Sequence, residues 1–221
     1  ISRRFPLLIL SVNVGSRAEQ QFSTFRLVVD GAVMQGCVTV DGHSVQIGRI
    51  FHQEIDEITH TLVEMTNLVK RAMNNATQAL IESNLQLAED VIRQDEVVDN
   101  MQHELDARTM LVLAKQQPVA SDLRTLVTSL RMSADLERIG DMAHHIANLS
   151  RMHHPNKVVP QELQDDVRSM GKVASDLINK VAKILVSKDL EEAKQLEIDD
   201  DEMDKLHRKL IKTLTSKDWP H

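Results

Sequence analysis

The chain has 221 residues and a mass of 25.0 kDa, and its 42% apolar content can bury a substantial core, which excludes an intrinsically disordered protein. Its 26 basic and 33 acidic residues give a formal net charge of −7, the wrong sign for a protein that coats nucleic acid or anionic lipid. Aromatic residues make up only 2% and Cys37 is the single cysteine, which argues against an aromatic-rich β-sandwich and a disulfide framework. No apolar run approaches the roughly 20 residues of a membrane span, so a cytoplasmic location is expected.

Residues 1–50 differ in composition from the rest of the chain. They contain five of the seven glycines and no lysine. The stretch from Cys37 to Ile47 has the Asp-Gly pair and the alternation of a β-hairpin, but no further strand follows to complete a sheet. Because the chain begins with Ile1, we expect residues 1–50 to be a poorly ordered or non-native N-terminal extension, with a regulatory arm as the alternative.

From Phe51 onward, apolar residues recur every three or four positions, which predicts long amphipathic helices. The expected helices span residues 51–82, 85–115, 118–153, 160–186 and 190–215. Pro118 favours a helix start because its missing N–H costs nothing in the first turn. On the helix that it begins, the apolar side is assigned to Leu123, Val127, Leu130 and Ile139.

An internal repeat organises these helices. Shifting the chain by 105 positions aligns Asp95 with Asp200 and Asp99 with Asp204, and Ser83-Asn84-Leu85 then faces Lys188-Asp189-Leu190. The expected fold is therefore all-α, with tandem three-helix bundles. Residues 51–158 would form the first repeat, and residues 159–221 a second repeat that lacks its third helix.

Pairs of carboxylates one helical turn apart are the candidate chemistry. Like charges at this spacing repel by a few tenths of a kcal/mol, so their recurrence points to a compensating cation or to basic neighbours, with a plain solvated face as the alternative. Oxygen ligands suit Mg or Mn, and histidine nearby also admits Fe or Zn. The pairs are Glu137 with Asp141, Asp95 with Asp99, and Asp200 with Asp204.

Helical geometry places Glu137 and Asp141 on one face with His144 and Asn148, which we expect on the outer side of the bundle. The spacing from Asp141 to His144 is one of three acid-x-x-His spacings in the chain, and such spacings occur in carboxylate-bridged di-metal enzymes. They do not recur under the shift, so most histidines are expected at the surface and the di-metal enzyme stays the alternative. No phosphate-binding loop, dinucleotide motif or nucleophile elbow is present, so no catalytic function is expected.

Two neighbouring motifs resemble the signature of the PhoU family of phosphate-specific transport accessory proteins. They are Gln116-Gln-Pro-Val-Ala-Ser-Asp-Leu-Arg124 and Arg131-Met-Ser-Ala-Asp-Leu-Glu-Arg-Ile-Gly-Asp141. The resemblance covers about residues 51–221 and implies two repeated three-helix bundles with metal clusters at Glu/Asp-x-x-x-Asp motifs. It assigns Glu137 and Asp141 as metal ligands, Asp95 and Asp99 as neighbouring candidates, and Asp200 and Asp204 as their second-repeat counterparts.

The resemblance also implies regulation instead of catalysis. A member of this family would restrain phosphate uptake and the phosphate-starvation response, as an adaptor between the phosphate ABC transporter's ATPase and a sensor histidine kinase. It would act as a homodimer, reaching the membrane only through its partners. The chain departs from the family pattern in residues 1–50 and in the absent second Glu-Arg-Ile-Gly-Asp-like motif, since Trp219-Pro220-His221 stands where a sixth helix is expected to begin.

Overall fold

The computed structural model describes residues 42–116, 118 and 120–216, and this part of the chain contains helices and no strand. The all-α prediction is therefore confirmed. The elements are α2 (Gly42–Glu82), α3 (Leu85–Gln116), α4 (Ala120–His153), the short 3₁₀ helix η1 (Gln161–Leu163), α5 (Gln164–Ser187) and α6 (Leu190–Leu214).

The predicted helix boundaries agree with these bounds to within a few residues, except at the start of the first helix. That helix begins at Gly42, so residues 42–47 are helical although their sequence has the alternation of a hairpin. A helix satisfies its backbone hydrogen bonds within one segment, whereas a hairpin here would have no third strand to support it. The rest of the expected N-terminal extension, residues 1–41, lies outside the described residues.

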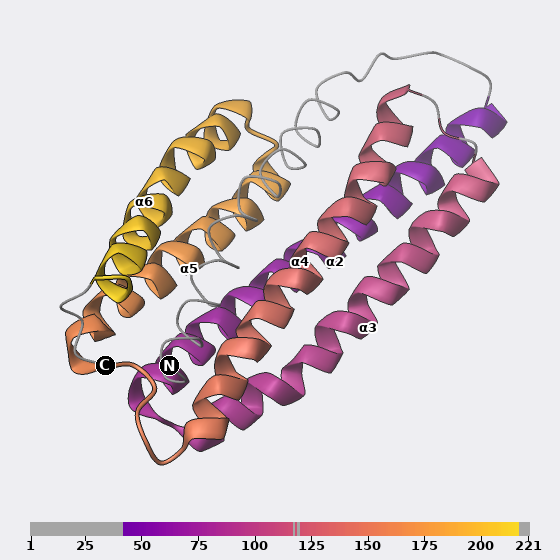
Figure 1. Ribbon diagram of the computed structural model, residues 1–221. Helices are drawn as coiled ribbons and strands as arrows, with labels where there is room; N and C mark the ends of the chain where they lie inside the picture. The colour runs from indigo at the N-terminus through magenta and orange to yellow at the C-terminus, as the bar shows by residue number, and fades with distance from the viewer. Residues whose placement is uncertain (1–41, 117, 119, 217–221) are drawn as a thin grey trace.

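The helix α2 is the centre of the molecule. It packs against α3 and α4 on one side and against α5 on another, while α6 packs on α5 (Figure 1). Within the described chain, α2, α3 and α4 therefore form a three-helix bundle. The α5–α6 hairpin packs on this bundle mainly through the contact of α5 with α2.

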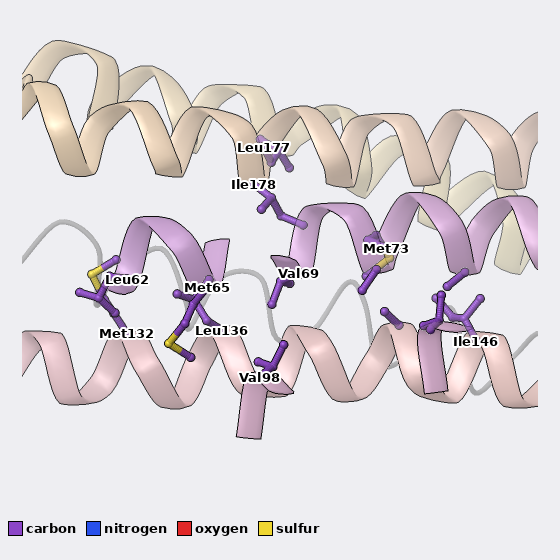
Figure 2. Packing of buried hydrophobic residues seen from close by; sticks show 14 of the residues in the cluster. Leu62, Met65, Val69, Met73, Val98, Met132, Leu136, Ile146, Leu177 and Ile178 are labelled. Carbon is purple, nitrogen blue, oxygen red and sulfur yellow. The ribbon is translucent and has the colours of Figure 1, made fainter. Parts of the chain in front are cut away.

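Apolar residues on several faces of α2 explain this central position. Figure 2 shows side chains of α2 between those of α4 and α3 on one side and those of α5 on the other. The labelled residues are Leu62, Met65, Val69 and Met73 of α2, Val98 of α3, Met132, Leu136 and Ile146 of α4, and Leu177 and Ile178 of α5. One continuous core therefore joins the bundle to the hairpin.

The packing of α5 on α2 depends on a glycine. A Cβ atom at Gly171 would lie 2.5 Å from Thr77 Cγ2 and 2.6 Å from Thr77 Oγ1, closer than real side chains approach. Farther along the same pair of helices, Lys70 Nζ donates a 2.7 Å hydrogen bond to Asn179 Oδ1. The absent side chain of Gly171 is thus what lets the two helices meet at this point.

In its first half, α4 turns a different side to the core from the predicted one, whereas Ala143 and Ile146 in its second half are buried as expected. Leu123 and Val127 are 42% and 37% exposed, whereas Leu126 and Leu136 are buried. The buried side also contains small hydroxyl residues, and these satisfy their own hydrogen bonds on nearby acceptors. Thr128 donates to Arg124 O, Ser129 to Thr125 O, Ser133 to Asp106 Oδ1 of α3, and Ser150 to Ala79 O of α2. Because serine and threonine occupy part of the core-facing side of α4, the spacing of apolar residues alone does not identify that side.

The two helix-to-helix loops have the same construction, which confirms the register of the internal repeat. Ser83 and Lys188 occupy equivalent positions and have left-handed backbones, with φ of 55° and 54°. The next residue caps the following helix: Asn84 Oδ1 accepts from Leu87 N at 3.1 Å, and Asp189 Oδ1 accepts from Glu191 N at 2.8 Å. The α2–α3 and α5–α6 hairpins thus close by the same turn.

Candidate functional site

The packing of α3 against α4 brings four of the predicted carboxylates into one seam. Asp95 and Asp99 lie on α3, and Glu137 and Asp141 lie on α4. Burial raises the pKa of Glu137, and the charges of Asp141, Asp99 and Asp95 and a hydrogen bond with Asp141 raise it further. The two pairs predicted separately from the sequence are therefore one cluster, half-buried between helices and not on a fully outer face as expected.

Asp99 is affected by the same cluster. Its pKa is raised first by burial and then by the negative charges of Asp95 and Asp141, while His103 and His144 lower it. A carboxyl group whose pKa is raised in this way is destabilised in its charged form, so Asp99 and Glu137 favour a bound proton or a bound cation nearby.

The sequence placed His144 on the same face as Glu137 and Asp141 but did not assign it to the candidate site, and the structure makes it a member of this cluster. Its Nδ1 atom contacts Asp95 Oδ2 across the α3–α4 seam, and the Asp95 side chain is only 12% exposed. The available signals were the Asp141-x-x-His144 spacing and the shared face of the two residues, but the contact itself depends on how α3 and α4 pack. At Gly140, a Cβ atom would lie 3.5 Å from Asp95 Oδ1, so the helices are also close here.

The types of side chain in the cluster are suitable ligands for a divalent cation. The cluster offers carboxylate oxygens and an imidazole from two helices, and the mutual repulsion of the carboxylates is what a bound cation would relieve. Among the described residues, however, no three His, Cys, Asp or Glu side chains are arranged closely enough to form a metal site in this conformation. Metal binding there would require the side chains to adjust.

The second-repeat pair lies elsewhere. Asp200 and Asp204 are on α6, which packs on α5, and they are not among the charges that shift Asp99 or Glu137. Asp200 is buried, at 8% exposed, and Asp204 Oδ2 accepts a 3.2 Å hydrogen bond from Arg208 Nη2. The structure therefore does not bring the α6 pair to the α3–α4 cluster.

The acid-x-x-His spacing of Glu57 and His60 does not form a joint site either. Glu57 contacts the Arg108 guanidinium of α3, which also donates from Nε to Glu54 Oε2 at 2.9 Å, so these acids tie α2 to α3. His60 is exposed, with Nδ1 3.7 Å from Glu64 Oε1. Glu57 thus contributes to packing through an ion pair.

Fold and site together define an all-α protein of stacked helical hairpins with a half-buried acidic cluster between two helices. The PhoU domain model matches residues 62–150 and 167–218. The chain belongs to the PhoU family.

Named relatives agree with this assignment. The chain is 40% identical over 172 residues to the phosphate-specific transport system accessory protein PhoU homolog 1 of Mycobacterium tuberculosis, covering 78% of each protein. It is 38% identical over 171 residues to PhoU homolog 2 of the same species, covering 77% of this chain and 80% of that protein.

A solved structure supports the fold. The phosphate transport system regulatory protein PhoU from Streptococcus pneumoniae matches with a TM-score of 0.66 and 23% identity, over 73% of this chain and 75% of that one. Among the described helices of this chain, none combines the length and the apolar character needed to cross a bilayer.

Proposed function

We propose that this protein is an accessory regulator of phosphate transport. It restrains phosphate uptake and the phosphate-starvation response, as a cytoplasmic adaptor between the ATPase of the phosphate ABC transporter and its sensor histidine kinase, and it works as a homodimer. The observation that carries the proposal is membership of the PhoU family across both helical hairpins, with relatives named as phosphate-specific transport accessory proteins.

We further propose that the α3–α4 cluster binds a metal ion. Asp95, Asp99, Glu137 and Asp141 would hold Fe or Zn, with Mg or Mn as the alternatives, and Asp200 and Asp204 would form a second site on α6. The raised pKa values of Asp99 and Glu137 support the first site, because burial and the neighbouring negative charges both disfavour the charged carboxylates in the absence of a cation. A bound cation would offset the repulsion and cross-link α3 to α4.

The family names favour this regulatory role over the carboxylate-bridged enzyme that the sequence left as an alternative. The structure adds an argument in the same direction, because Glu57, the acid of one of the three acid-x-x-His spacings, already pairs with Arg108.

A transcriptional reporter tests the adaptor. In cells that lack this gene, a phosphate-starvation promoter should be active even in high phosphate, and expression of the full chain should silence it. No change on deletion would rule out the proposed regulatory role.

The metal site is tested in the same strain with Glu137→Ala/Asp141→Ala. This variant should fail to silence the promoter, and its purified form should carry less Fe or Zn by elemental analysis. The matched control is Glu197→Ala/Asp201→Ala, which removes two exposed acids with the same one-turn spacing on α6. Full silencing by the cluster variant would keep the adaptor and remove the metal from its mechanism.

A further inference from the structure

The helix α4 has a second apolar stripe that faces away from the core. Its members follow one another at spacings of four, three and four residues: Leu123, Val127, Leu130 and Ala134. Leu123 and Val127 are 42% and 37% exposed, and Leu130 and Ala134 are half-buried. The spacing is that of the a and d positions of a heptad, which is how one helix packs along another in a coiled coil.

Three arginines lie beside this stripe and repeat with the same heptad spacing. Arg124, Arg131 and Arg138 are seven residues apart and each occupies the heptad position after a d residue, the e position. All three side chains are exposed, and none makes a direct ion pair within the described residues. Arg131 and Arg138 do act at longer range on Asp135 of the same helix, because their charges lower the pKa that burial raises there. Charges at e positions select the partner of a coiled coil, because they face the flanking residues of the opposite helix.

The charge pattern identifies the kind of partner. An α-helix with apolar a and d residues, and carboxylates on the flank that faces Arg124, Arg131 and Arg138, would bury the stripe and neutralise the arginines. A second copy of α4 does not meet this requirement. Antiparallel pairing would set arginine against arginine, and parallel pairing would set it against the uncharged g positions Leu126, Ser133 and Gly140.

The same helix argues against a phosphate polymer. In the next heptad the a and d positions are Glu137 and Asp141, so the stripe ends at the acidic cluster. A nucleic acid strand along the arginines would meet these carboxylates, whereas an amphipathic protein helix can end before them or place a basic residue opposite them.

We propose that the outward face of α4 is the docking surface for an acidic amphipathic helix of a partner protein. This inference deepens the proposed adaptor function and rests on it, since an adaptor needs a surface for a second protein. The face lies on the part of α4 that precedes the acidic cluster, and its residues, Leu123 to Ala134, are distinct from the cluster's carboxylates.

A designed peptide tests the surface directly. The probe is a labelled helix of about 28 residues with Leu at a and d and Glu at e and g, whose glutamates oppose self-pairing. The full chain should bind this peptide and not its Lys counterpart. Arg124→Glu/Arg131→Glu/Arg138→Glu should weaken binding of the Glu peptide by roughly tenfold or more and create binding of the Lys peptide.

The matched control is Arg71→Glu/Lys172→Glu/Lys183→Glu, which reverses three exposed basic residues of α2 and α5 and should leave binding unchanged. Thermal unfolding of both triple variants verifies that they fold. Absence of binding to the Glu peptide, or equal binding by the α4 variant, overturns the proposal.

A photo-crosslinking residue at Val127 then identifies the natural partner, with the same residue at the exposed Ile198 of α6 as control. The expected product is a crosslink to a helix with apolar heptad positions and flanking carboxylates, lost on reversal of the three arginines. Crosslinks to lipid, nucleic acid or this chain itself overturn the proposal. If that crosslink forms but deletion of the gene leaves the starvation promoter silent in high phosphate, the docking surface stands and the proposed phosphate function fails.

Discussion

At the scale of single residues, two helical glycines have opposite surroundings. Gly171 has Thr77 directly in the space of a Cβ atom, whereas at Gly140 the nearest atoms, Asp95 Oδ1 and Val98 Cγ1, are both 3.5 Å away, an ordinary contact distance. Replacing either glycine with alanine gains about 1 kcal/mol from helix propensity. The difference between the two variants in their free energy of unfolding therefore reports the packing at the α2–α5 crossing.

We predict that Gly171→Ala destabilises the protein by roughly 1–3 kcal/mol, because α5 must shift away from α2 to relieve the overlap with Thr77. Urea unfolding measures the change. Gly140→Ala is the matched control and should be neutral or stabilising. Equal effects of the two substitutions would show that the crossing tolerates a methyl group and that the close approach is unimportant.

The cluster residue Glu137 gives a prediction with a defined pH dependence. Its pKa in the folded protein lies above the ordinary value of 4.5, because of burial and the neighbouring acids. The folded state therefore binds this proton more tightly than the unfolded state does, so the associated stability is full below about pH 4.5 and is lost as the pH rises through the folded pKa.

In chelator at neutral pH, Glu137→Gln should therefore raise the melting temperature and flatten its decline between acidic and neutral pH. The same substitution should reduce any stabilisation by added Zn or Mn. The control Glu197→Gln changes an exposed glutamate of α6 and should do neither. A lower melting temperature for Glu137→Gln in chelator would mean that the charged carboxylate is stabilising in the folded protein.

The candidate site shows what could be predicted at this scale. Spacing of four residues placed Glu137 with Asp141 and Asp95 with Asp99, because residues one helical turn apart share a face. Whether the two pairs meet in one cluster depends on the rotation and axial position of α3 against α4. The contact of His144 with Asp95 depends on the same packing. That arrangement is fixed by long-range packing, which single-helix periodicity does not contain.

At the scale of helices, the ends were the most predictable features. Asn84 and Asp189 are short polar residues directly after a left-handed residue, and each caps the helix that follows. The start of α2 could not be found in this way, since the residues around Gly42 have the pattern of a turn. The core face of α4 could not be found either, because Ser129, Ser133 and other hydroxyl residues occupy part of it.

The caps themselves can be tested. Asn84→Ala and Asp189→Ala should each lower the free energy of unfolding by about 1 kcal/mol, because each leaves backbone N–H groups of the next helix unsatisfied. The two effects should add, since the caps lie in different loops. Asn74→Ala is the control, because Asn74 is exposed within α2 and its loss should be neutral or favourable. Denaturant unfolding that finds no cost at either cap would contradict their role.

At the scale of the whole molecule, the helices differ in how many neighbours support them. In the described chain α2 packs against α3, α4 and α5, whereas α6 packs mainly against α5. Opening α6 exposes less apolar surface than opening α2, so local unfolding should begin in α6 and end in α2.

Amide hydrogen exchange measures this order. We expect the slowest exchange in the middle of α2 and faster exchange throughout α6, with α3 and α4 between them. Gly171→Ala should accelerate exchange in α5 and α6 more than in α3 and α4, because the α2–α5 crossing holds the hairpin in place. Uniform exchange across all helices would instead indicate a single cooperative unit.

The 105-residue repeat predicts an internal two-fold symmetry at the α2–α5 crossing. Under the 105-residue relation, the contact between Thr77 and Gly171 maps onto Ala182 and Thr66, which occupy the same antiparallel register on the two helices. The crossing is thus built like the isologous interface of a homodimer, contained within one chain. An isolated first repeat, residues 42–153, would expose on α2 the surface that α5 covers. We expect two such fragments to pair through that surface, which sedimentation analysis would detect as a dimer and Thr77→Lys would return to a monomer.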